Sequence, residues 1–383
     1  MARRVEKVAL RAMSPGTPGR ELTVLRYGRA GARPKAYLQA SIHSGEFPGM
    51  MALHHLIPML DRADKAKRIK GEIVIVPHAN PIGLSQVLLA THLGRYDFFA
   101  RDNFNRNYHD LAEPVAEVVE NKLGADPERN VKMIRAAALA VLGEMEPMNE
   151  LQDLRLALMS RSIDADIVID LHCDQQASLH HFISQRDWPA IKDLSAQVGA
   201  TAVMYNSPYP MTMTFSGANG TMWSKLADRF KGKPVPQACQ SSTIEYRGQR
   251  DVNDRLGAMD AQNLYKFLQR RGLIGGNPGP LPRALGTATP MEGMDVGYAP
   301  VGGVLVYKRQ AGDKVKKGEV ICEIIDPFSI DPERARTPVR TATAGVLFSR
   351  RTDGQLTWPG AGCFRVAGPK PLPHRKGRSG LDD

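Results

Sequence analysis

The sequence predicts an α/β domain with a largely parallel or mixed sheet, followed by a small all-β domain. Up to about residue 275, short runs of β-branched and aliphatic residues alternate with stretches of helical periodicity, as in layered α/β domains. Glycine and proline then crowd together in residues 272–290, and only short strands between turns follow. We therefore expect an α/β domain over residues 1–275, a β domain over 285–369 and a flexible tail over 370–383.

Each strand of the α/β domain is predicted from a brief apolar run, and each helix from apolar residues at helical spacing. Pro48, followed by Gly49, marks the start of the first helix, because proline fits the first helical position. The predicted strands are residues 21–28, 36–42, 72–77, 165–171, 200–205 and 241–247, and the predicted helices are residues 48–63, 128–145, 150–162, 189–198, 220–230 and 251–272.

The composition indicates a folded chain, with 42% hydrophobic and 24% charged residues among 383. The net charge is +11, but lysine and arginine are scattered, which favours a basic surface that attracts anionic small molecules over a nucleic-acid interface. No apolar run is long enough for a secretory signal or a membrane span, so we expect a cytoplasmic protein. The four cysteines (Cys173, Cys239, Cys322 and Cys363) lie too far apart for a zinc knuckle or a disulfide framework.

Two histidines and a glutamate follow two of the predicted strands. His43 and Glu46 lie three residues apart in a strand-to-helix loop, and His172 ends a later apolar strand. Such strand ends meet at one edge of an α/β sheet, where these folds place their sites. Two imidazoles and one carboxylate suit catalytic zinc, which keeps its fourth position for water. The sequence therefore predicts one zinc ion per chain, with Asp170 or Asp174 orienting an imidazole.

Further polar residues could carry out chemistry beside this ion. Glu245 ends another apolar strand, where its carboxylate could take a proton from the attacking water and pass it to a leaving nitrogen. An arginine-rich segment supplies donors that suit a substrate carboxylate or a developing oxyanion. These donors are Arg95, Arg101, Asn105 and Arg106.

Each motif also has a plain structural interpretation. A His-x-x-Glu pair arises often by chance, and a histidine at a strand end is more often a core residue than a ligand. Glu245 could form an ion pair with Arg247 or Arg250, and Asn105 with Arg106 could be a surface turn. The occurrence of all these motifs, in order, along one α/β domain favours a functional site.

The order of motifs resembles that of the succinylglutamate desuccinylase and aspartoacylase family, a branch of the zinc carboxypeptidase-like fold. The resemblance covers about residues 20–369 and rests on His43-x-x-Glu46, Asn105-Arg106, Asp170-Leu171-His172 and Ile244-Glu245. It implies that the zinc ligands are His43, Glu46 and His172, that Asn105 and Arg106 bind the substrate carboxylate, and that Glu245 is the general base. It also implies a small barrel-sandwich-like β domain at the C-terminus.

The implied reaction is hydrolysis of the amide bond of a small, carboxylate-bearing N-acyl amino acid or related amine. Arg95 is favoured over Arg101 as the group that polarises the scissile carbonyl, and Tyr209 and Tyr246 are candidates for a substrate contact. A carboxypeptidase acting on peptides and a vestigial metal-binding or partner-binding protein are the alternatives. We expect a small anionic substrate and neither a nucleic-acid nor a membrane partner, and the sequence leaves a homo-oligomer open.

Overall fold

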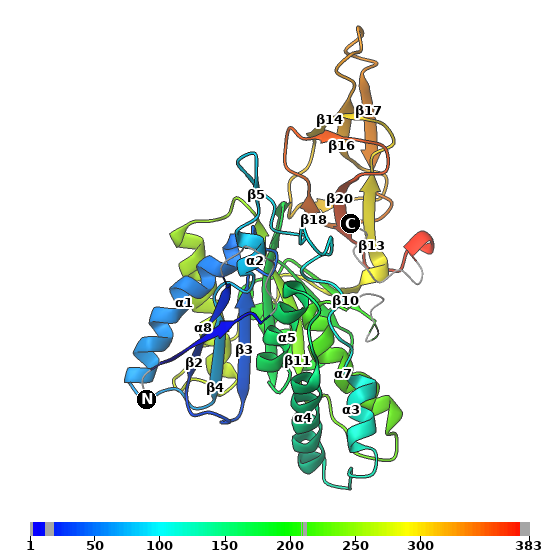
Figure 1. Cartoon of the computed structure of the whole chain (residues 1–383). Coiled ribbons are helices and arrows are strands. Elements are labelled where there is room, and N and C mark those ends of the chain that lie inside the picture. The colour runs from blue at the N-terminus through cyan, green and yellow to red at the C-terminus, as the bar shows by residue number, and fades with distance from the viewer. Residues whose placement is uncertain (1–2, 12–18, 208, 210–212, 376–383) are drawn as a thin grey trace.

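A computed structural model describes residues 3–11, 19–207, 209 and 213–375 (Figure 1). Its larger part is built on a nine-stranded mixed sheet in the order β1-β2-β4-β3-β7-β11-β9-β10-β12. Strands β4, β3, β7 and β11 run parallel at the centre, and β9 is antiparallel to β11. The strands are β1 (Arg4–Ala9), β2 (Glu21–Tyr27), β3 (Lys35–Ala40), β4 (Glu72–Val76), β7 (Ile167–Asp174), β9 (His180–Ser184), β10 (Ala202–Asn206), β11 (Gln240–Gly248) and β12 (Ala288–Pro290).

Helices cover both faces of this sheet. One face packs on α1, α6 and α8, and the other on α3, α4, α5 and α7, each through its own apolar core. Because both faces are covered, β3 and β4 are buried at every residue. The helices are α1 (Phe47–Lys65), α3 (Ala112–Val119), α4 (Pro127–Glu144), α5 (Glu150–Ser162), α6 (Trp188–Val198), α7 (Phe215–Arg229) and α8 (Asp254–Arg270), with the short α2 (Pro81–Leu84) and the hairpin β5 (Val87–Leu88) and β6 (Thr91–His92) beside them.

The C-terminal part consists of two antiparallel four-stranded paths, β13-β20-β18-β15 and β17-β16-β14-β19. Apolar side chains such as Leu305, Ile324 and Val366 fill the space between them. Strand β8 (Gln176–Ala177), which follows β7, pairs with β18, so the two parts share a ladder. The strands are β13 (Met294–Tyr298), β14 (Gly303–Tyr307), β15 (Lys314–Val315), β16 (Val320–Ile325), β17 (Arg336–Arg340), β18 (Gly345–Arg350), β19 (Leu356–Thr357) and β20 (Gly362–Ala367).

This architecture confirms the predicted fold class, an α/β part with a mixed sheet followed by an all-β part. The strands β1, β9 and β12 of the sheet and the helix α3 were not predicted. Strand β1 lies at an edge and is mostly exposed, so its charged sequence lacks the apolar alternation of a half-buried strand. Among the described residues, no helix combines the length and the apolar character that crossing a membrane requires.

The large sheet also extends past residue 285, where the β domain was expected to begin. Strand β12 pairs with β10, and its proline is tolerated because β12 is the last strand of the sheet. The glycine and proline content of this segment therefore concealed an edge strand. In the expected tail, Pro373–Arg375 forms a single 3₁₀ turn in which Arg375 is buried, and residues 376–383 lie outside the described part of the chain.

Helix α1 begins in close contact with β7. A Cβ atom added at Gly49 would lie 2.7 Å from the Cβ of Leu171 and 3.0 Å from its carbonyl oxygen, so only glycine fits there without displacement. Glu46 immediately precedes α1, and His172 follows Leu171 on β7. The contact at Gly49 therefore sets the separation of these two side chains.

Replacing Gly49 by alanine is expected to lower the free energy of unfolding by about 1–3 kcal/mol, since the added methyl group must push α1 away from β7. Urea unfolding followed by circular dichroism measures the change. Gly143→Ala is the matched control, because its Cβ would meet open space on α4 and should leave stability unchanged or slightly raised. Equal effects of the two substitutions would contradict a tight contact between α1 and β7.

Candidate metal centre

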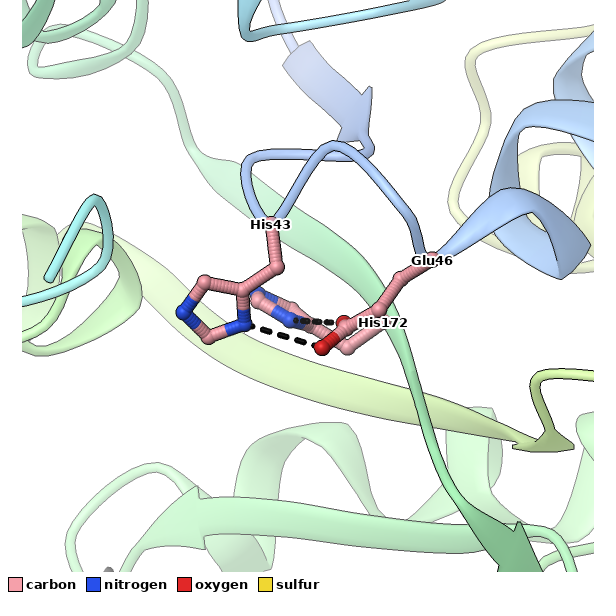
Figure 2. Close-up of side chains that lie close together, drawn as sticks. All are labelled: His43, Glu46 and His172. Atoms are coloured by element: carbon pink, nitrogen blue, oxygen red, sulfur yellow. Dashed lines mark hydrogen bonds and ion pairs between the residues drawn. The ribbon is translucent and has the colours of Figure 1, made fainter. Parts of the chain in front are cut away.

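The three predicted ligands come from two neighbouring parallel strands. β3 ends at Ala40, which lies beside Leu171 of β7, so the loop after β3 and the end of β7 meet at the same edge of the sheet. Glu46 occupies the N-cap position of α1 but makes no capping hydrogen bond. Its side chain is instead directed towards His43 and His172, as Figure 2 shows.

The Glu46 carboxylate lies between the two imidazoles. Its Oε1 atom is 2.9 Å from Nδ1 of His43, and its Oε2 atom is 2.8 Å from Nδ1 of His172. One ligand atom from each of the three residues lies within 4.8 Å of the others, and all three side chains are buried. This donor set can hold a metal ion, with both histidines offering Nδ1.

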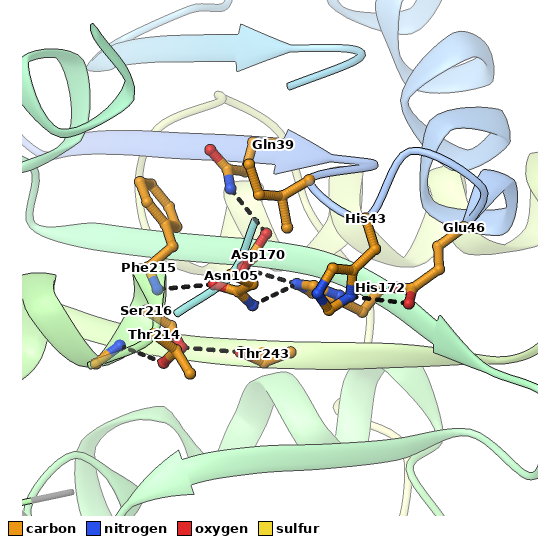
Figure 3. A network of polar contacts seen from close by, with 12 residues as sticks. Gln39, His43, Glu46, Asn105, Asp170, His172, Thr214, Phe215, Ser216 and Thr243 are labelled. Atoms are coloured by element: carbon orange, nitrogen blue, oxygen red, sulfur yellow. Dashed lines mark hydrogen bonds and ion pairs between the residues drawn. The ribbon is translucent and has the colours of Figure 1, made fainter. Parts of the chain in front are cut away.

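The opposite nitrogen of each imidazole is held by an oxygen acceptor. Nε2 of His43 is 2.9 Å from Oδ1 of Asn103, and Nε2 of His172 is 2.9 Å from Oδ2 of Asp170. Gln39 in turn donates to the other Asp170 oxygen at 2.9 Å, as Figure 3 shows. Such acceptors fix the tautomer that leaves Nδ1 free for a metal. Asp170 orients His172, and Asn103 was not anticipated from the sequence.

Electrostatics favour an anionic Glu46. Burial alone would raise the pKa of its carboxyl, but the charges of His43 and His172 outweigh burial and hold that pKa well below the usual range. Burial alone would lower the pKa of the His172 imidazolium. The negative charges of Asp170 and Glu46 outweigh burial and hold this pKa well above its usual value. A carboxylate that stays ionised is the form that binds a metal cation.

Glu245 lies on β11 directly beside His172 of β7. Burial raises the pKa of the Glu245 carboxyl to about 8, against the lowering effect of the His172 charge, and Oε2 has no hydrogen-bond partner among the described residues. Arg247, considered as a partner of Glu245 in a structural ion pair, bonds Asp260 at 3.1 Å instead. Glu245 is therefore a half-buried residue next to the ligand set, with a carboxyl pKa of about 8.

The arginine-rich segment divides between the site and the surface. Nη1 of Arg95 is 3.3 Å from Nδ1 of His43 and 3.4 Å from Oε1 of Glu46. Arg106 lines the same cavity, whereas Arg101 is exposed and does not line it. Between these arginines the structure thus places Arg95, and not Arg101, beside the ligands.

Asn105 lies in the interior of the site. Its Nδ2 atom is 3.1 Å from Nε2 of His172, and its Oδ1 atom accepts a hydrogen bond of 2.8 Å from the backbone N–H of Phe215 (Figure 3). The surface-turn interpretation of Asn105 is therefore wrong, because the residue is buried. The amide connects the candidate ligand His172 to the first residue of α7.

The two tyrosines considered for substrate contact lie away from the cavity. Successive residues of a strand point to opposite faces, so Tyr246 faces away from Glu245 and is buried in the core beneath α1 and α8. Its assignment as a substrate-binding residue needs correction for this reason. Tyr209 is 41% exposed and packs under the Arg186 guanidinium, 5.8 Å from ring centroid to Cζ.

A cavity of about 930 Å³ opens over the candidate ligands, Glu245, Arg95 and Arg106. The β domain contributes part of its wall, including Tyr298, Arg351 and Trp358. Asp187, near the start of α6, also lines it and was not anticipated from the sequence, where an aspartate before Trp-Pro is typical of a helix start.

The fold and this site define an α/β protein with a candidate His-Glu-His metal centre at the carboxyl edge of its mixed sheet. The chain belongs to the succinylglutamate desuccinylase/aspartoacylase family, whose catalytic-domain model matches residues 32–255. Membership makes it a hydrolytic enzyme of the deacylase type, acting on amide bonds. Among curated proteins, none matches this chain.

Solved structures share the whole fold. Family proteins from Shewanella amazonensis SB2B and Shewanella frigidimarina NCIMB 400 superpose with a TM-score of 0.82 at 20% and 18% identity. Each alignment covers 96% of this chain, and 98% and 97% of those chains. The product-bound ectoine utilization protein EutE (DoeB) from Ruegeria pomeroyi gives 0.65 at 16% identity, over 96% of this chain and 95% of its own. At these identities the likeness establishes the fold.

Asp170→Asn is expected to weaken binding of a divalent metal about 10- to 100-fold, because His172 loses the acceptor that fixes its tautomer. Competition with a chromophoric chelator measures the affinity. Asp164→Asn provides the control: Asp164 pairs with Arg33 before β7 begins, at the opposite end of the strand, so affinity should not change. An unchanged affinity in Asp170→Asn would refute the orienting role.

Proposed function

We propose that this protein is a zinc-dependent hydrolase that cleaves the amide bond of a small, carboxylate-bearing N-acyl amino acid or related N-acyl amine. The single observation that carries the proposal is the position of Glu245, a half-buried residue with a shielded Oε2 atom, beside His172 of the His-Glu-His set. A carboxyl group with a pKa of about 8 lies close enough to physiological pH both to accept and to return a proton. Family membership supports the same reaction type.

Zinc is the metal whose preferences suit the donor set. Two neutral imidazole nitrogens and one carboxylate make three protein ligands, the number that leaves a catalytic zinc ion a free position. When bound, zinc would supply Lewis-acid polarisation of the carbonyl and a lower pKa for the attacking water. His43, Glu46 and His172 would hold it, with Asn103 and Asp170 fixing the two rings.

The remaining side chains then have distinct tasks. Glu245 takes the proton of the attacking water and delivers it to the leaving nitrogen, as a general base followed by a general acid. The Arg95 guanidinium stabilises the negative charge that develops on the carbonyl oxygen. Arg106, with Asn105 beside it, anchors the substrate carboxylate through charge-assisted hydrogen bonds.

Glu245→Gln is expected to lower kcat by about 10²- to 10⁴-fold while zinc stays bound, because the amide cannot accept the proton. Release of free amine from a panel of N-acyl amino acids measures the activity, and metal analysis checks the zinc content. Tyr246→Phe is the matched control one residue along β11, on the buried face, and should retain activity. Equal activity of wild type and Glu245→Gln would sink the proposal, and release of C-terminal residues from peptides instead would indicate a carboxypeptidase.

Arg95→Ala is expected to lower kcat by about 10²-fold or more, since one charged donor to the developing oxyanion is lost. Arg101→Ala should behave as wild type, because Arg101 is exposed and outside the cavity. Steady-state kinetics on the best substrate of the panel compares the two variants. The opposite ranking would assign the polarising role to Arg101.

A further inference from the structure

A second buried carboxylate lies in the cavity wall, away from the ligands. Asp187 is only 1% exposed and occupies the N-cap position of α6. An N-cap aspartate normally accepts a hydrogen bond from its own helix, but Asp187 makes none. Pro189, the second helical residue, has no N–H to donate, and the N–H of Ala190 bonds the backbone carbonyl of Asp187 at 3.0 Å instead of its side chain.

The carboxylate of Asp187 is only weakly satisfied within the protein. Neither oxygen makes a hydrogen bond of normal distance and angle to a described residue, and none of these residues forms an ion pair with it. Nε2 of the nearby Gln237 donates to the carbonyl oxygens of Gly220 and Cys239, at 3.0 and 3.3 Å. Burial raises the pKa of the Asp187 carboxyl to about 7, and weak hydrogen bonding from the Gln237 amide and the Ser241 N–H offsets this only in part. A buried carboxylate with only weak partners is costly unless a ligand supplies stronger ones.

Two neighbours of Asp187 also line the cavity. Gly220 of α7 faces Asp187, and a Cβ at Gly220 would lie 3.1 Å from Oδ2 of Asp187 and 3.6 Å from Cβ of Ser241. The Ser241 hydroxyl also has no partner among the described residues. All three residues line the cavity, so a carboxylate and a hydroxyl with unused acceptor atoms lie together in one part of its wall, where the glycine lets α7 approach closely.

This pocket is continuous with the reaction site along β11. Ser241, Thr243 and Glu245 alternate along the strand, share its cavity face and all line the cavity. Four residues of a strand span about 13 Å, so a group that reaches Asp187 from beside Glu245 must be carried on an extended chain. The other wall is the start of α7, where Ser216 bonds Thr243 at 2.9 Å and the N–H of Phe215 bonds Asn105. Helix α7 therefore contacts both Asn105, which is proposed to bind the substrate carboxylate, and the pocket at Asp187.

We propose that Asp187, with Ser241, forms a subsite for a cationic group at the end of a long side chain on the amine half of the substrate. The substrate class would be N-acyl derivatives of basic amino acids such as lysine or arginine, whose carboxylate reaches Asn105 and Arg106. This assignment rests on the proposed hydrolase function. A cation satisfies both Asp187 oxygens and neutralises the buried charge, whereas an acidic side chain would be repelled.

The test compares kcat/KM of the zinc-loaded enzyme for Nα-acetyl-lysine and Nα-acetyl-norleucine, which have side chains of similar length but differ in the charge. The lysine substrate should be favoured by about 100-fold or more, because the neutral chain leaves the carboxylate unpaired. Asp187→Asn should remove most of this preference while retaining turnover of the norleucine substrate. Asp193→Asn is the matched control on α6, since Asp193 pairs with Arg271, and should keep the preference.

The outcomes separate this assignment from the hydrolase proposal. Hydrolysis of both substrates at equal rates, unchanged in Asp187→Asn, overturns the cation subsite and leaves the hydrolase function standing. If neither substrate is cleaved, calorimetry of the zinc-loaded protein with free lysine and free norleucine tests the subsite without the reaction. Lysine that binds no better than norleucine, or does not bind, overturns the subsite.

If Asp187→Asn fails to fold, Ser241→Ala provides a second variant that keeps the carboxylate. It should reduce the preference for the lysine substrate several-fold, and an unchanged preference counts against the pocket.

Discussion

The Glu46 carboxylate, buried between the imidazoles of His43 and His172, is the interaction around which the rest of the site is arranged. A buried charge of this kind is tolerated only when every polar neighbour is paired, because desolvation costs several kcal/mol for an isolated ion. Here that requirement links three chain segments: the loop after β3, the start of α1 and the end of β7. The parallel pairing of β3 with β7 and the close approach of Gly49 to Leu171 involve residues next to the ligands. A change in this packing would therefore also move the site.

The supporting contacts continue into the middle of the sheet. Tyr37 donates to Oε1 of Gln39 at 2.8 Å, and Gln39 donates to Asp170, which holds His172. All four residues are buried, so each hydrogen bond acts in a low-dielectric environment where its geometry is held firmly. The position of the His172 ring is therefore fixed by side chains that lie inside the core of the sheet. Through these contacts the sheet also fixes one ligand of the candidate metal centre.

Charge is distributed unevenly around the cavity. Arg95 lies beside the ligands and Arg106 lines the same cavity, while Asp187, which precedes α6, adds a carboxyl group elsewhere in its wall. The β domain adds Arg351 and Trp358, with the guanidinium stacked 5.0 Å from the ring centroid. Positive and negative groups at different depths suit a substrate that carries both a carboxylate and a cation. The β8–β18 ladder joins this β part to the α/β part, so both parts contribute to the cavity wall.

The sequence by itself determined the fold class and the strand-end positions of His43, Glu46, His172 and Glu245, because these follow from local periodicity and short spacing. Only the tertiary structure decided which of Arg95 and Arg101 faces the ligands, since one loop carries both and its course depends on distant packing. It also placed Tyr246 in the core and Asp187 in the cavity. The sequence Asp-Trp-Pro predicts a helix start, but it does not show whether the aspartate side chain caps that helix or faces a cavity. Its environment is created by α7 and β11, which reach it only when the chain folds.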